Sequence, residues 1–233
     1  MWGRAMDTLS KIPLFKSLDE RNAERWASSC NWRTYEANEL IIDFEDESTD
    51  VRFILSGTVR IILRVAAGRE MILAEMSEGD HFGELAAIDG HTRSANVTAM
   101  STSRMCIMPA SVFRQILAEE PEVNLTILQQ LSARVRHLNV RLSEHSFLQT
   151  RHRLYCELLR MSRPRAINRE QRAISPPPTQ KDLAARIGSR REVVSREIAN
   201  LKREGLVDRT AGALVIADVP RLNAMISEGW ESL

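Results

Sequence analysis

Cysteine is scarce in this chain of 233 residues, and the three that it has, Cys30, Cys106 and Cys156, stand far apart. No Cys-x-x-Cys pair and no cysteine–histidine spacing of the metal-binding kind occurs. An iron–sulfur sensor needs a cluster of cysteines, so this class of protein is disfavoured. We therefore expect three reduced, structural thiols and no bound metal.

Long apolar runs are missing as well. No stretch of the chain approaches the ~20 apolar residues that a membrane-spanning helix needs, and residues 1–6 lack the apolar core of a secretory signal. We therefore expect no membrane partner and a cytoplasmic location. The composition, 43% hydrophobic and 27% charged, suits a soluble protein with packed cores.

Catalytic constellations are also absent. The sequence has no nucleophile beside a base, no cluster of metal ligands and no Walker-type phosphate loop. We therefore expect a binding protein and not an enzyme. The length allows one large domain or two small ones.

What the chain does have is an uneven distribution of charge. Residues 1–124 carry 13 Lys and Arg and 20 Asp and Glu. Residues 151–210 carry 15 Lys and Arg and only 7 Asp and Glu. The total of +1 hides this contrast. A basic C-terminal segment predicts contact with a polyanion, and a solvated basic face is the alternative that charge alone leaves open.

The order of secondary-structure signals separates several regions. Short helices are expected over residues 12–30, short strands broken by turns over residues 35–108, and a short helix over residues 111–118. Closely spaced strands of this kind predict an antiparallel sandwich or roll. Residues 162–178 predict a loop or hairpin, and residues 220–233 a terminal helix to which we assign no function.

Residues 82–95, with the sequence FGELAAIDGHTRSA, combine the groups that a cyclic phosphodiester nucleotide needs. The guanidinium of Arg93 can hold a phosphate through two charge-assisted hydrogen bonds. The backbone amides from Gly83 to Leu85 would add anion-binding donors at a helix start. The carboxylate of Glu84 cannot help a phosphate and suits a ribose 2′-OH donor instead. An ordinary turn with a solvated arginine is the alternative that these residues alone leave open.

A long helix is predicted over residues 122–147. Its apolar positions are spaced by three and four residues, which is a heptad seam, and they are Leu128, Leu131, Val135, Leu138 and Leu142. Such a seam favours a second copy of the same helix, and hence a homodimer. Packing of the helix against its own sheet is the alternative.

Residues 179–206 predict a helix–turn–helix with a polar-faced second helix, followed by a β-hairpin wing. Three prolines end the preceding segment because they cannot continue a helix. Thr179 caps the first helix, and Gly188 makes the turn. An exposed helix in which Glu192 pairs with Arg196 is the alternative.

These two motifs, in this order, resemble those of the CRP/FNR family of transcription regulators, which includes the cyclic AMP receptor protein. The first resembles the phosphate-binding cassette of the family and the second its helix–turn–helix. The resemblance implies an α+β fold, with an N-terminal antiparallel β-roll that binds a cyclic nucleotide, a long dimerisation helix and a C-terminal winged helix–turn–helix. We place these parts at residues 1–121, 122–148 and 149–233.

The resemblance also implies an allosteric ligand. Cyclic AMP is the first choice, and cyclic GMP is the alternative. The implied ligand-binding residues are Gly83, Glu84, Leu85, Arg93, Ser94, Leu138 and Asn139. The last two carry over by register along the long helix, where enteric relatives have hydroxyl side chains. Here Leu138 can only pack, whereas Asn139 offers both a donor and an acceptor.

The DNA partner implied by the resemblance is a palindromic operator with half-sites like TGTGA. The implied DNA-binding residues are Thr179, Gln180, Arg190, Arg191, Glu192, Ser195 and Arg196. Arg191 and Arg196 can each donate two hydrogen bonds to a guanine, and Glu192 can accept a hydrogen bond from a cytosine. The first three of the set are better placed for phosphates, which give affinity and not sequence choice. RNA polymerase is the expected protein partner.

A regulator of the same fold with another input is the second hypothesis. Haem, a small metabolite or no ligand at all would then control DNA binding, and His81 and His91 border the glycine motif as candidate haem ligands. A colourless protein would exclude haem. A phosphodiesterase would be excluded by recovery of the nucleotide without hydrolysis.

Overall fold

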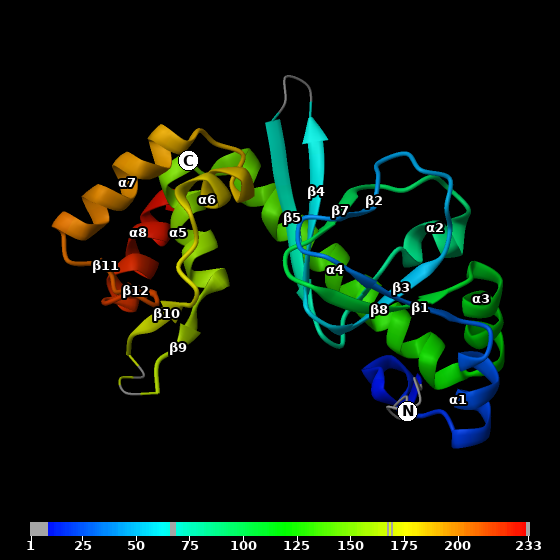
Figure 1. The fold of residues 1–233 in the computed structure, drawn as a ribbon. Helices are drawn as coiled ribbons and strands as arrows, with labels where there is room; N and C mark the ends of the chain where they lie inside the picture. Colours follow the sequence, from blue (N-terminus) through cyan, green and yellow to red (C-terminus); the bar gives the residue numbers. More distant parts are fainter. Residues whose placement is uncertain (1–8, 66–68, 167, 169, 232–233) are drawn as a thin grey trace. The chain divides into compact units, whose positions relative to one another are not determined.

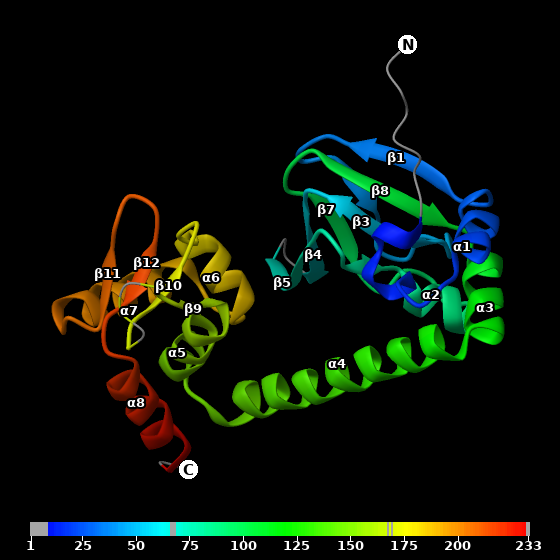
Figure 2. The same cartoon turned by 90° about the horizontal axis from the view of Figure 1, so that it is seen from below.

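The computed structural model describes residues 9–65, 69–166, 168 and 170–231. The chain separates into two compact units, one ending at Arg134 and the other beginning at Val135. The boundary falls inside helix α4 (Pro121–Phe147), which Figure 2 shows as one unbroken helix. Each unit has a hydrophobic core of its own.

The first unit is built on two antiparallel four-stranded sheets, with the orders β1-β8-β3-β6 and β2-β7-β4-β5 (Figure 1). The strands are β1 (Asn31–Tyr35), β2 (Leu40–Ile42), β3 (Val51–Ser56), β4 (Thr58–Val65), β5 (Arg69–Ser77), β6 (His81–Phe82), β7 (Asn96–Ala99) and β8 (Ser103–Met108). Alternate side chains from both sheets form one core, which includes Ile54, Val59, Phe82, Val97 and Met105. This arrangement is the predicted antiparallel β-roll.

Helices cover the other face of the first sheet. They are two 3-10 turns (Leu9–Lys11 and Pro13–Phe15), α1 (Glu20–Ala27) and α3 (Ala110–Glu119), and the first turns of α4 join them. Val51 and Phe53 of β3 point into this second core. Because successive side chains of a strand point to opposite faces, Arg52 and Ile54 lie on the face that looks between the sheets.

The second unit is a winged helix–turn–helix. Its elements after α4 are α5 (Thr150–Met161), β9 (Arg163–Pro164), β10 (Arg172–Ile174), α6 (Gln180–Arg186), α7 (Arg191–Arg203), β11 (Val207–Arg209), β12 (Leu214–Ile216) and α8 (Val219–Glu231). The four strands form one antiparallel sheet in the order β11-β12-β10-β9. Leu183 of α6, Val194 of α7 and Leu222 of α8 share its hydrophobic core.

Ion pairs and hydrogen bonds attach the end of α4 to the helices that follow it. Arg160 of α5 donates through Nη2 to both carboxylate oxygens of Glu144, at 2.6 and 2.8 Å, and also pairs with Glu157. Arg141 donates to the carbonyl oxygen of Arg186 at 2.6 Å. The side chains of Glu144 and Arg186 are buried. The last turns of α4 are therefore part of the second unit.

The structure confirms the α+β fold class and most of the predicted elements, including the long helix, the helix–turn–helix, the wing and the terminal helix. The strand region starts earlier than predicted, because β1 begins at Asn31 and not near Tyr35. Only Tyr35 of β1 is buried, so the strand lacks the apolar alternation that a sequence pattern detects. No helix among the described residues has both the length and the apolar character needed to cross a bilayer.

Candidate ligand site and DNA-binding surface

The glycine motif forms a tight turn against an arginine. Gly83 has a left-handed φ of 89° and stands directly before α2 (Glu84–Asp89). A Cβ at this position would lie 2.6 Å from Arg93 Nη1 and 2.8 Å from the carbonyl oxygen of Asp50. Glycine alone avoids both contacts and adopts this φ without strain. The structure therefore brings together Gly83 and Arg93, which the sequence pattern predicted as parts of one site.

Arg93 is buried, with 3% of its surface exposed. Its Nε donates to Ser48 Oγ at 3.0 Å and its Nη1 to the carbonyl oxygen of Gly83 at 3.1 Å. Its Nη2 donates to Asp50, to the carbonyl oxygen at 2.8 Å and to Oδ1 at 3.2 Å. Burial lowers the pKa of Arg93, and the charge of Asp50 opposes this shift. An anion at this site would meet a guanidinium that is already oriented.

Glu84, the first residue of α2, is 2% exposed and pairs with an arginine from α4. Its Oε1 accepts a hydrogen bond from Arg134 Nη1, although the two residues are 50 positions apart. A carboxylate has acceptor positions on both oxygens, and Oε2 accepts no hydrogen bond from any described residue. The Glu84 carboxylate is thus fixed in place while one oxygen stays available to a hydroxyl donor.

Arg52 of β3 lies on the other side of Asp50. Its Nη2 is 3.2 Å from Asp50 Oδ2, while Arg93 Nη2 is 3.2 Å from Asp50 Oδ1. One carboxylate therefore stands between two guanidinium groups. The Nε and Nη1 atoms of Arg52 are buried and have no hydrogen-bond partner in the part of the chain that the structure describes.

The remaining residues of the motif have different environments. Leu85 and Ser94 are exposed, and so is His91. His81 is buried with its ring 5.5 Å from that of Phe53, and burial lowers its pKa. The two histidines considered for haem thus share no common environment. Over the described residues, no group of three His, Cys, Asp or Glu side chains could hold a metal ion.

The seam of α4 is exposed in the single chain. More than half of the residue surface is accessible at four of its five positions, Leu128, Val135, Leu138 and Leu142. The fifth, Leu131, packs against the core of the first unit. Asn139, which the resemblance implies as a ligand-binding residue together with Leu138, is also exposed on α4. A row of exposed apolar side chains along one helix is typical of an interaction surface.

The helix–turn–helix has the local chemistry that the sequence predicted. The Thr179 hydroxyl accepts from the backbone amide of Asp182 at 3.0 Å and so caps α6. Gly188 takes a left-handed φ of 62° in the turn. The Ser189 amide then donates to the carbonyl oxygen of Ala184 at 2.9 Å. These bonds fix the end of α6 and the start of α7.

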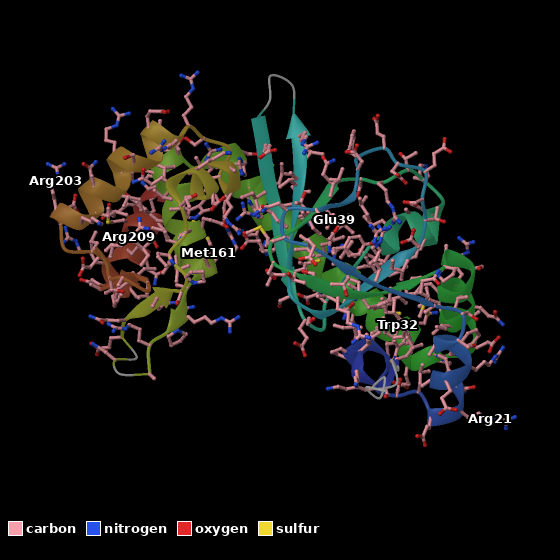
Figure 3. The ribbon with its side chains drawn as sticks, viewed as in Figure 1. Arg21, Trp32, Glu39, Met161, Arg203 and Arg209 are labelled. Atoms are coloured by element: carbon pink, nitrogen blue, oxygen red, sulfur yellow. The ribbon has the colours of Figure 1, made fainter. Side chains whose placement is uncertain are left out.

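The exposed face of α7 is basic. Arg190, Arg191, Glu192 and Arg196 are exposed, Gln180 and Ser195 are half-buried, and Val194 and Ile198 face the core. Glu192 and Arg196 make no ion pair with any described residue, so the self-paired helix is not formed. The basic side chains continue to Arg203 at the end of α7 (Figure 3). Arg190, Arg191 and Arg196 therefore offer exposed guanidinium groups that form no ion pair with any described residue.

Comparison with known proteins identifies a family of domains for each of the two regions. Residues 32–120 match the model of the cyclic nucleotide-binding domain, and residues 152–225 match the Crp-like helix–turn–helix domain. A CRP-like cAMP-activated global transcriptional regulator of Mycobacterium tuberculosis is 30% identical over 171 residues, which cover 72% of this chain and 76% of that protein. The cAMP-activated regulator Vfr of Pseudomonas aeruginosa is 26% identical over 91% of this chain and 98% of its own.

Solved structures show the same fold. A CooA variant from Carboxydothermus hydrogenoformans superposes with a TM-score of 0.78 at 19% identity, covering 93% of this chain and 95% of that one. The c-di-GMP responsive regulator CLP of Xanthomonas campestris gives a TM-score of 0.72 at 22% identity, over 85% and 99% of the two chains.

The fold and the two matched domains define a DNA-binding transcription regulator with a cyclic nucleotide-binding domain, and not an enzyme. The similarity to the mycobacterial regulator covers most of both proteins. The chain belongs to the CRP/FNR family.

Sequence reasoning missed three residues that adjoin the candidate ligand site, namely Asp50, Arg52 and Arg134. None of the three lies in the window of residues 82–95 from which the sequence predicts the site. Each meets the glycine motif through a contact between residues distant in the sequence, and no local pattern marks such a contact.

Proposed function

We propose that this protein is a homodimeric transcription regulator that binds cyclic AMP and, in response, binds a palindromic operator. Cyclic GMP is the alternative ligand. The observation that carries the proposal is the pair of buried, oppositely charged side chains, Arg93 and Glu84, held on either side of the turn at Gly83. The mycobacterial and pseudomonad relatives are both named as cAMP-activated regulators.

The two charged groups suit the two ends of a cyclic sugar-phosphate. The Arg93 guanidinium would hold the phosphate, with help from the backbone amides from Gly83 to Leu85 and the hydroxyl of Ser94. Glu84 would accept a hydrogen bond from the ribose 2′-OH, since the contact with Arg134 holds its carboxylate in place. Binding requires that Arg93 exchange some of its present bonds to Asp50 for bonds to the ligand.

The exposed seam of α4 supports a parallel pairing of two such helices. Leu138 and Asn139 lie on this helix, where the base of the nucleotide would contact them, Leu138 by packing and Asn139 by hydrogen bonds. Ligand contacts across the seam would favour one placement of the DNA-binding parts. The ligand shifts this equilibrium only if it binds that placement better.

The second unit would place α7 in the major groove of DNA. Arg191, Glu192 and Arg196 would read bases of a TGTGA-like half-site, with Ser195 beside them. The residues Thr179, Gln180 and Arg190 would contact phosphates, although the hydroxyl of Thr179 already serves as a helix cap. Two such helices in a dimer would meet half-sites about 34 Å apart.

The function implies the remaining partners and the location. A regulator of this kind would act on RNA polymerase, and we infer a cytoplasmic location from its DNA target. We assign residues 1–121 to nucleotide binding, 122–148 to dimerisation and 149–233 to DNA binding.

One titration tests the proposal. Calorimetry with cyclic AMP and cyclic GMP should give heat of binding, and the preferred nucleotide should increase affinity for a palindromic duplex in a gel-shift or anisotropy assay. No heat with either nucleotide would overturn the ligand assignment and favour another input. Equal DNA binding with and without nucleotide would overturn the coupling.

Arg93→Ala should abolish nucleotide binding and nucleotide-dependent DNA binding, because the phosphate loses its buried guanidinium. Arg33→Ala is the matched control, since Arg33 forms an exposed ion pair with Glu39 away from the site. Mass photometry should show that both variants remain dimers. Unchanged affinity of a folded Arg93→Ala dimer would contradict the assignment.

A further inference from the structure

Arg52 has a mostly buried side chain whose hydrogen-bonding capacity is only partly used. Its side chain is 11% exposed, and its single ion pair joins Nη2 to Asp50 Oδ2 at 3.2 Å. The Nε and Nη1 atoms are buried and have no partner among the described residues. Two donor atoms of one charged group are therefore left without an acceptor.

Such a group is costly for the protein to keep. Buried polar atoms in folded proteins are almost always hydrogen-bonded, and an unpaired donor of a charged group carries a large desolvation penalty. An apolar residue at a strand position that faces the core would avoid this cost. An acceptor that is bound only in the functional state would also remove it.

The position of Arg52 shows where that acceptor would come from. Arg52 pairs in the sheet register with Phe82 of β6, the residue directly before Gly83. It lies on the same strand face as Ile54, between the two sheets. It also shares the Asp50 carboxylate with Arg93. Arg52 therefore adjoins the turn that forms the phosphate site.

The charges of the site leave room for one more anion. Three arginines, Arg52, Arg93 and Arg134, meet two carboxylates, those of Asp50 and Glu84, in direct ion pairs. Asp46 also interacts electrostatically with Arg52 and Arg93, but it lies at the solvent surface, where its charge is screened. The excess of one positive charge matches the single negative charge of a phosphodiester.

We propose that Arg52 is a second phosphate-binding residue, whose guanidinium donates through Nε or Nη1 to the phosphate that Arg93 holds. The two non-bridging oxygens of a phosphodiester share one negative charge, as the two oxygens of a carboxylate do. Asp50 already shows that a group of this kind fits between the two guanidinium groups. This inference rests on the proposed nucleotide-binding function.

Arg52→Gln tests the inference, with Arg33→Gln as the control for loss of one positive charge. Calorimetric titration with cyclic AMP and cyclic GMP should show roughly tenfold or greater loss of affinity in Arg52→Gln, because charge-assisted hydrogen bonds are lost. Arg52→Lys should show an intermediate loss, since it keeps the charge without the planar fork. Arg33→Gln should bind like the wild type.

Thermal unfolding of the unliganded variants separates a binding role from a structural one. The stability of unliganded Arg52→Gln should stay close to that of the wild type, because the loss of the ion pair with Asp50 offsets the removal of unpaired charged donors. The stabilisation by nucleotide should shrink. An Arg52→Gln protein that is less stable but binds nucleotide with wild-type affinity would overturn the inference and leave the proposed function standing.

A wild-type protein that binds neither nucleotide would instead overturn the proposed function. Inorganic phosphate then tests Arg52 as an anion site, by the rise in unfolding temperature over sodium chloride at equal ionic strength. A rise in the wild type and in Arg33→Gln that is lost in Arg52→Gln supports the site, and an equal rise in all three overturns it.

Discussion

At the scale of single residues, Gly83 determines the backbone shape of the candidate ligand site. Its left-handed φ and the approach of Arg93 Nη1 leave no space for a Cβ, which would also lie only 2.8 Å from the carbonyl oxygen of Asp50. The flexible arginine can move away from an added methyl group, but the backbone of Asp50 cannot do so cheaply. The turn and the guanidinium therefore depend on one another.

We expect Gly83→Ala to destabilise the protein by about 1–3 kcal/mol, because it adds a backbone clash to an unfavourable φ. It should also weaken nucleotide binding, since Arg93 is displaced. Denaturant unfolding and calorimetry measure the two effects. Gly90→Ala is the matched control, because Gly90 also has a left-handed φ, of 75°, but nothing lies within 4 Å of an added Cβ. Equal losses in both variants would show that strain alone is responsible.

The single residues also show which parts of the candidate ligand site can be predicted from the sequence. Gly83, Glu84 and Arg93 were predicted as one site because they lie in a single short window. Arg134 was not, because its contact with Glu84 depends on where α4 crosses the sheet, and that placement follows from packing. Asp50 and Arg52 precede the motif by a whole hairpin, so only the pairing of β3 with β6 brings them to it.

At the scale of elements, α4 is the helix whose exposed apolar seam needs a partner. Leu142 is 66% exposed, the largest value among the exposed apolar residues of this helix. We expect Leu142→Asp to convert the dimer to monomers, because a pair of carboxylates would face each other across the seam. Sedimentation velocity measures the change.

Val140→Asp is the control for this prediction. Val140 is also more than half exposed on α4 but lies off the seam, so the variant should remain dimeric. A dimer that survives Leu142→Asp and dissociates with Val140→Asp would place the interface on another face of the helix.

Two arginines at α7 should differ in what they contribute to DNA binding, one to the recognition of bases and the other to general affinity. Arg196→Ala should cost about 1–3 kcal/mol of binding free energy on the operator and relax the base preference at one position, because its proposed contact is to a base edge. Arg190→Ala should weaken binding to operator and unrelated DNA alike and reduce the salt slope by about 1, because its proposed contact is to phosphate. Anisotropy titrations at several salt concentrations measure both. Identical behaviour of the two variants would contradict the assigned roles.

Elements with strong local signals were predicted well, and those without them were not. The helix–turn–helix has a capping threonine, a glycine turn and regularly spaced apolar residues, each of which acts locally. Strand β6 has only two residues and β1 has one buried side chain. Both are strands because neighbouring strands pair with them, and pairing leaves little trace in the sequence of a short segment.

At the scale of the whole molecule, four histidines make the free energy of unfolding depend on pH. Burial lowers the pKa of His81, His137, His145 and His152 below the ordinary value of 6.5. The unfolded chain therefore takes up protons at a higher pH than the folded protein does. The contribution of these histidines to the free energy of unfolding is fully present above pH 6.5. It is lost as the pH falls from there toward the lower pKa values of the folded state.

We expect the free energy of unfolding to fall as the pH is lowered from about 7.5 to 5.5, as measured by urea unfolding. His145 has a clear part in this, because its Nδ1 lies 2.9 Å from Arg153 Nη1 and must be unprotonated to accept that bond. His145→Gln should flatten the curve, whereas His91→Gln, at an exposed position, should leave it unchanged. A curve that is flat or rises on acidification would contradict this account.

The bonds from Arg141 and Glu144 to the helices that follow α4 determine where an isolated DNA-binding fragment of this protein should begin. A fragment beginning at residue 149 would lack the Glu144 carboxylate, which pairs with Arg160. It would also lack the Arg141 guanidinium, which donates to the carbonyl oxygen of Arg186. An excised DNA-reading piece should therefore start upstream of Arg141, so that it carries the final turns of the preceding helix as its own structural support.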